Sequence, residues 1–114
     1  MKVIITESQY NRVIDQFITH LLEPHEERTS KVLADSIFWV KSGEVIVEIE
    51  DSKDFYLEYG IWNTISKMFD LNRDQTQSVI NIWLDKHYGF GELIPKRGPM
   101  FLADNWNSII DLDD

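Results

Sequence analysis

The 114-residue sequence contains no cysteine, which excludes a disulfide scaffold, thiolate zinc sites and cysteine nucleophiles. Long apolar runs are also missing, since none approaches the roughly 20 residues needed to span a bilayer. The opening nine residues carry one lysine and an apolar patch that is too short for a secretory signal. We therefore expect a cytoplasmic protein with no membrane partner.

Glycine is scarce as well, with five residues in the chain, and no glycine-rich phosphate-binding loop is present. The lone Gly89-Phe90-Gly91 follows an expected helix and is typical of a C-cap and turn. The three histidines have no nucleophile at a recognisable spacing, and Glu48 and Glu50 show no sign of the apolar pocket that would raise a carboxyl pKa. These absences predict a protein that is not an enzyme and needs no cofactor.

Basic side chains are few, with 11 Lys and Arg against 20 Asp and Glu, and the net charge of −9 argues against generic nucleic-acid binding. The charge is unevenly distributed. Residues 1–59 carry −6 and residues 101–114 carry −4, whereas residues 60–100 carry +1. The stretch between 60 and 100 is therefore the least acidic part of the chain.

Apolar and aromatic residues, 43% and 12% of the sequence, are sufficient for one hydrophobic core. We expect a single domain over residues 1–114, with a core region at 7–102 and an acidic tail at 103–114. Lys2 to Ile5 suggests a short strand, and Thr6 offers an N-cap for the helix that follows. That helix should end at Pro24. Its apolar positions recur with helical spacing at Tyr10, Val13, Ile14, Phe17, Ile18, Leu21 and Leu22.

After a polar connection at 25–35, three short segments have the composition of strands: 36–41, 44–50 and 55–59. Ser42-Gly43 suits a tight hairpin between the first two. The second segment alternates, so that Glu44, Glu48 and Glu50 should share a solvent-facing side. The pattern predicts a three-stranded antiparallel meander with one wet face.

The stretch from Gly60 to Gly89 reads as two amphipathic helices joined by Asp70-Leu71-Asn72. Asn72 can cap the second helix, with Gln75 at the capping-box spacing. A helix, a short turn and a helix form the outline of a helix-turn-helix. The second helix begins with side chains whose donors and acceptors match base edges, namely Arg73, Gln75, Thr76 and Gln77, with Asn81 one turn further on.

The next segment has the pattern of a hairpin. Short segments at 92–94 and 100–102, which are mainly apolar, flank a turn at 95–99, whose tip carries Lys96 and Arg97. The order of helix, strands, helix pair and hairpin resembles a winged-helix domain over residues 7–102. This resemblance implies DNA or RNA binding through the second helix of the pair, with Lys96 and Arg97 meeting a phosphate strand. The chain departs from the family in lacking the usual turn glycine, with Asp70 near that place, and in having more strands before the pair.

Separately, the opening KVIITESQYNRVI resembles small uncharacterised proteins of marine tailed phages and metagenomes, which have no assigned activity to transfer.

Alternative interpretations remain open. Two helices with a short turn also make an αα-corner packed on a sheet, and the polar start of the second helix is then only a solvated face. A protein-interaction domain or a self-associating one would use the acidic and aromatic surfaces, including a tail that places Trp106, Ile109 and Ile110 on one side of a short helix. A solvated helix end explains better than a metal site why five possible ligands lie close in sequence: His20, Glu23, His25, Glu26 and Glu27. The sequence thus predicts an α+β fold: a helix, a meander, a helix-turn-helix-like pair, a wing hairpin and a short tail helix.

Overall fold

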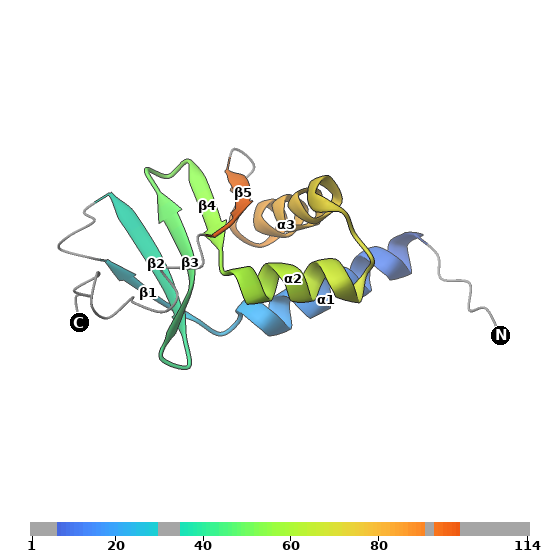
Figure 1. Cartoon of the computed structure of the whole chain (residues 1–114), viewed down its shortest axis with the longest axis horizontal. Coiled ribbons are helices and arrows are strands. Elements are labelled where there is room, and N and C mark those ends of the chain that lie inside the picture. Colours follow the sequence, from blue (N-terminus) through green and yellow to red (C-terminus); the bar gives the residue numbers. More distant parts are fainter. Residues whose placement is uncertain (1–6, 30–34, 91–92, 99–114) are drawn as a thin grey trace.

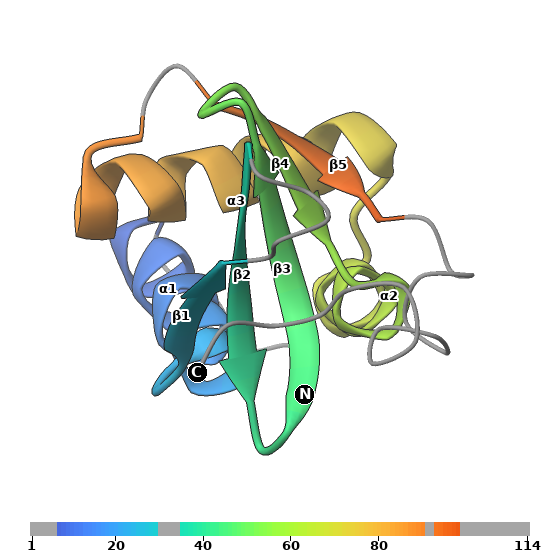
Figure 2. The ribbon, with the colours of Figure 1, turned by 90° about the vertical axis from the view of Figure 1, so that its left-hand side faces the viewer.

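The protein folds as one five-stranded sheet with three helices against one of its faces (Figures 1 and 2). The computed structural model describes residues 7–29, 35–90 and 93–98. The helices are α1 (Glu7–Leu22), α2 (Tyr59–Met68) and α3 (Arg73–Tyr88). The strands are β1 (Glu26–Thr29), β2 (Ser36–Lys41), β3 (Glu44–Glu50), β4 (Asp54–Leu57) and β5 (Ile94–Arg97). The predicted mixed α+β class is confirmed.

The sheet has the order β1-β2-β3-β4-β5, and its first four strands pair antiparallel. The expected meander of β2, β3 and β4 is therefore confirmed. Two details of it were wrong. The polar connection at 25–35 contains strand β1, and the third strand of the meander ends at Leu57, because the Glu58 side chain accepts hydrogen bonds from the amides of Gly60 and Ile61 and starts α2.

β5 pairs in parallel with β4 at the end of the sheet, so the sheet is mixed. The sequence pattern had placed residues 95–97 in a turn between two hairpin arms. The structure instead has Pro95 opposite Phe55 and Arg97 opposite Leu57 in a regular strand register. The expected second arm at 100–102 lies outside the described residues. Also outside them are the expected strand at 2–5, the Thr6 cap and the acidic tail at 103–114.

The hydrophobic core lies between the sheet and the helices. Its contributions from the helices include Ile18 and Leu22 of α1, Ile65 of α2 and Trp83 of α3, all with at most 1% of their surface exposed. The periodicity of α1 correctly indicated this face, although its first residues, Tyr10 and Val13, are exposed. No helix among the described residues has the length and apolar character needed to cross a lipid bilayer.

A bulge in β3 changes which of its residues are buried. Val40 pairs with Val45 while Trp39 pairs with Val47, so Ile46 is an extra residue on β3, and it is buried in the core beside Val47. The prediction of a wet glutamate face was wrong at Glu48, which is only 7% exposed. Its carboxylate accepts a hydrogen bond from the buried hydroxyl of Ser36 at 2.9 Å.

The buried carboxyl of Glu48 makes stability depend on pH. Burial raises its pKa above the ordinary value, the Ser36 hydroxyl lowers it and the neighbouring charge of Glu50 raises it again. An acid with a raised folded-state pKa contributes stability below its unfolded pKa, and this stability is lost as pH rises through the folded pKa. At neutral pH the charged form is therefore the costly one.

We expect Glu48→Gln to raise Tm by a few degrees at about pH 7, because the amide oxygen can still accept from Ser36 without a buried charge. The gain should shrink towards about pH 4, where the wild-type carboxyl is protonated. Thermal melts followed by circular dichroism test this, with Glu44→Gln on the exposed end of the same strand as the matched control. Equal shifts for both variants at every pH would contradict it.

Candidate functional site

The turn between α2 and α3 closes α2 with a pair of backbone hydrogen bonds. The amide of Leu71 donates to the carbonyl of Ser66 at 2.8 Å, and the amide of Asp70 donates to that of Lys67 at 3.4 Å. This is the Schellman arrangement, which needs a left-handed residue at its centre. Asp70 takes that conformation, with φ of 52°. Asp70 thus occupies the turn position at which a winged-helix domain usually has glycine.

We expect Asp70→Gly to stabilise the protein by roughly 0.5 kcal/mol, since glycine adopts positive φ without the Cβ clash. Gly89 is the matched control, because it ends α3 with φ of 71° and Gly89→Ala should cost about 1 kcal/mol. Urea unfolding measures both variants. A loss of stability in Asp70→Gly would mean that the aspartate side chain compensates for its own backbone strain.

The beginning of α3 is fixed by the predicted capping box. The Asn72 side chain accepts from the amide of Gln75 at 2.8 Å, and the Gln75 side chain accepts from the amide of Asn72 at 2.9 Å. Thr76, a further predicted contact residue, does not face solvent. Its side chain is fully buried, and its hydroxyl bonds to the Asn72 carbonyl and the Ser66 hydroxyl, both at 2.8 Å. Two of the predicted contact residues therefore build the turn.

Gln77 joins the helix pair to the edge of the sheet. Its side-chain amide donates to the carbonyl of Pro95 at 2.6 Å, so α3 and β5 are tied together. Since β5 is held in this way, Lys96 and Arg97 are brought close to the helix pair, from a strand and not from the predicted hairpin turn. Asn81 lies further along α3 and is half-buried, and it is not among the residues of the pocket that these elements form.

The pocket lies between α2, the start of α3 and β5, and has a volume of about 500 Å³. Eight residues line it: Tyr56, Tyr59, Trp62, Asn63, Ser66, Arg73, Lys96 and Arg97. Three of them are basic and none of these described lining residues is acidic. The described part of the chain has nine Lys and Arg residues in all, so a third of them meet at this one hollow in a protein of net charge −9.

The basic side chains of β5 are positioned by the aromatic ones. The guanidinium of Arg97 lies over the Tyr59 ring, 4.6 Å from its centroid, and one of its nitrogens is 3.5 Å from the Asn63 side-chain oxygen. The ammonium of Lys96 is 5.7 Å from the centre of the Tyr56 ring. These contacts hold the cations beside ring surfaces.

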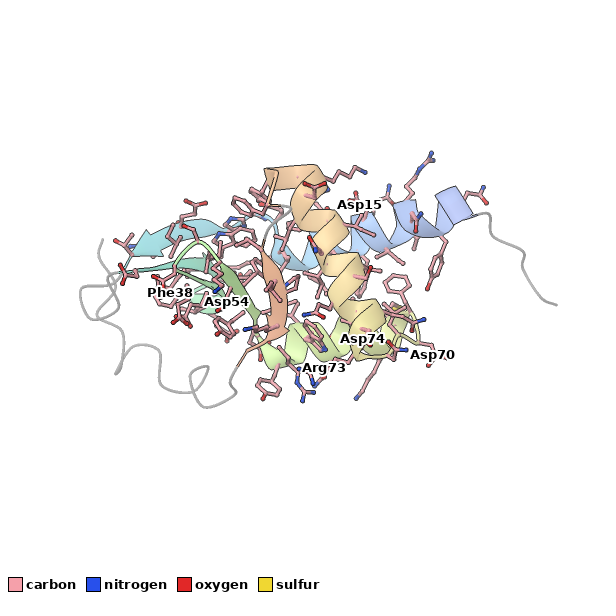
Figure 3. The ribbon with its side chains drawn as sticks, turned by 90° about the horizontal axis from the view of Figure 1, so that it is seen from above. Asp15, Phe38, Asp54, Asp70, Arg73 and Asp74 are labelled. Carbon is pink, nitrogen blue, oxygen red and sulfur yellow. The ribbon has the colours of Figure 1, made fainter. Side chains whose placement is uncertain are left out.

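Electrostatics favours the charged form of the lysine. Lys96 pairs with Asp54 at 3.1 Å, and this hydrogen bond raises the pKa of the ammonium. Burial, followed by the charge of Asp54, raises the pKa of the Tyr56 phenol, which keeps it neutral. Arg73 is exposed at the first position of α3 and has no acidic partner among the described ion pairs (Figure 3). The pocket therefore presents positive charge next to neutral rings.

The predicted site residues did not include the aromatic part of the pocket. Tyr56, Tyr59 and Trp62 are three residues apart and bridge the end of β4 and the start of α2. The signal was present, because a three-residue spacing within a helix places side chains on one face. It was obscured by the change from strand to helix at Glu58.

Among the residues that the structure describes, no group of three or more His, Asp or Glu side chains converges to hold a metal ion. The chain was also compared with known proteins. No protein-family model, curated protein or solved structure matches it.

Proposed function

We propose that this protein is a non-catalytic binding module that binds nucleic acid through the pocket between the helix pair and β5. The observation that carries the proposal is the convergence of Arg73, Lys96 and Arg97 beside Tyr56 and Tyr59. Phosphate groups are recognised by Arg and Lys, and bases by aromatic rings and guanidinium planes. No catalytic group is needed for this function. Of the residues expected to contact the ligand, Arg73, Lys96 and Arg97 are retained in the proposal.

A winged-helix arrangement is retained only in part. In this proposal α2 and α3, joined by the turn at Asp70, serve as the helix-turn-helix-like pair, and β5 follows them in the chain. The pairing of β5 with β4 and the hydrogen bond from Gln77 to Pro95 place the basic residues at a sheet edge. The proposal therefore rests on the pocket and does not need a wing.

The test is a titration of fluorescently labelled DNA and RNA oligonucleotides at about 50 mM salt, repeated at about 200 mM salt. Each phosphate contact to a single strand contributes about −0.7 to the slope of log affinity against log salt concentration, so three contacts give roughly −2. Binding with such a slope supports the proposal. Absence of binding at about 50 mM salt would overturn it.

A second candidate is a protein-interaction domain, and a different surface favours it. Val13 of α1 and Ile82 of α3 are 47% and 64% exposed, next to a small apolar groove lined by Ile14, Ile18 and Val79. Association through these side chains would respond little to salt, because its driving force is apolar burial. Light scattering of the wild type and of Ile82→Glu over a concentration series distinguishes self-association from a monomer.

A further inference from the structure

We infer that the pocket takes one unpaired nucleotide of a single strand, and that α3 does not read a duplex. This inference rests on the proposed nucleic-acid function and specifies its ligand. It differs from what a helix-turn-helix would do, in which the first residues of the second helix enter the major groove and contact base edges.

The start of α3 is not free to enter a groove. The side chain of Thr76 is buried, and that of Gln77 is engaged by Pro95. The Gln75 side-chain oxygen is used by the cap of the helix. Of the four predicted base-reading residues in the first turns, only Arg73 extends from the helix without a described hydrogen bond or ion pair.

The surroundings of α3 also oppose a duplex. β5 packs against α3 (Figure 1), so α3 does not stand free as the single helix that a major groove admits. Asp74 follows Arg73 in the first turn of α3, and Asp70 lies in the turn that precedes the helix (Figure 3). A second phosphate strand approaching this end of the helix would meet these carboxylates, and like charges repel it.

A single strand fits the same features. A volume of about 500 Å³ lies within the range of pockets that enclose one small ligand. An unpaired base can stack on the Tyr56 ring or on the guanidinium of Arg97. That guanidinium is itself held over the Tyr59 ring. The phosphate of the nucleotide then lies within reach of Arg73 at the mouth of the pocket. In a duplex the base is stacked and paired, and this surface would remain empty.

The experiment compares a 12-nucleotide oligo(dT), an oligo(rU) of equal length and a 12-base-pair duplex by fluorescence anisotropy at about 50 mM salt. We expect either single strand to bind at least about 10-fold more tightly than the duplex. The two single strands show whether the 2′-hydroxyl contributes. Tyr59→Leu, which removes the ring but keeps an apolar side chain, should weaken single-strand binding about 10-fold and leave the weak duplex binding unchanged. Tyr10→Leu, the same change at an exposed position of α1 outside the pocket, is the control.

The outcomes separate the inference from the proposed function. Duplex binding that equals or exceeds single-strand binding overturns the inference and leaves nucleic-acid binding intact. Equal weakening of both ligands by Tyr59→Leu also overturns it, because Tyr59 then only positions Arg97. No binding of any of the three ligands overturns the proposed function itself.

Discussion

Replacement of Arg73, Lys96 and Arg97 together by alanine is expected to lower affinity for a single-stranded oligonucleotide on the order of 100-fold at low salt. The three side chains line one pocket, and each can make a charge-assisted hydrogen bond to phosphate. Removing them removes the contacts that release counterions. The salt slope of roughly −2 expected for the wild type should therefore approach zero.

The control must change the net charge by the same amount at other places. Arg12→Ala, Lys53→Ala and Lys86→Ala meet this need, since Arg12 and Lys53 are exposed, and Lys86 makes only a surface ion pair with Asp15 at 3.6 Å. If both triple variants lose affinity equally, general attraction accounts for binding and the pocket does not. If only the variant of Arg73, Lys96 and Arg97 loses affinity, the pocket is the binding surface.

Trp83→Ala is expected to destabilise the fold by about 3–5 kcal/mol and to lower Tm by roughly 15–25 °C. Trp83 is 1% exposed and packs with Trp39 of the sheet, at 6.4 Å between ring centres, and with Tyr88. Its indole N–H donates to the Thr19 hydroxyl of α1 at 2.9 Å. The substitution leaves a cavity where α1, α3 and the sheet meet. The expected loss is a large part of the free energy of unfolding of an ordinary domain.

Ile82→Ala on the same helix is the matched control, because Ile82 is 64% exposed and should cost less than about 0.5 kcal/mol. Trp83→Phe adds a finer test. It keeps most of the ring volume but leaves the Thr19 hydroxyl without its donor, so adding Thr19→Val should recover part of the loss. Urea denaturation gives all four values. A cost for Trp83→Ala similar to that for Ile82→Ala would contradict the packing described for the core.

Local patterns were sufficient to predict the elements that depend on neighbouring residues. The helical spacing of Ile14, Ile18 and Leu22 correctly placed α1 against the core. The Asn72 and Gln75 spacing correctly predicted the capping box, because both partners lie within one turn. The meander was confirmed for the same reason, since tight turns join its strands in order.

Elements that depend on distant partners were missed. β1 has the sequence EERT, which lacks apolar alternation, and it is a strand because Glu27 and Arg28 pair with Trp39 and Phe38 of β2. β5 contains Pro95 and two basic residues, a composition typical of turns, and only its pairing with β4 makes it a strand. Burial of Glu48 likewise could not be read from strand alternation. Arg73, Lys96 and Arg97 were selected for their charge, whereas the pocket they share needed the fold.

The parallel pairing of β4 with β5 has a consequence for the order in which the protein acquires its binding surface. Parallel neighbours need a long crossover connection, and here both α2 and α3 lie in that connection. The helix pair can form from local contacts. β5, in contrast, pairs with residues far away in the sequence, Asp54 and its neighbours in β4, so this pairing requires the intervening chain to fold back. Until that strand docks, Lys96 and Arg97 are not beside Arg73. A nascent or partly folded chain would therefore have no such cationic hollow, and recognition would begin only once folding is complete.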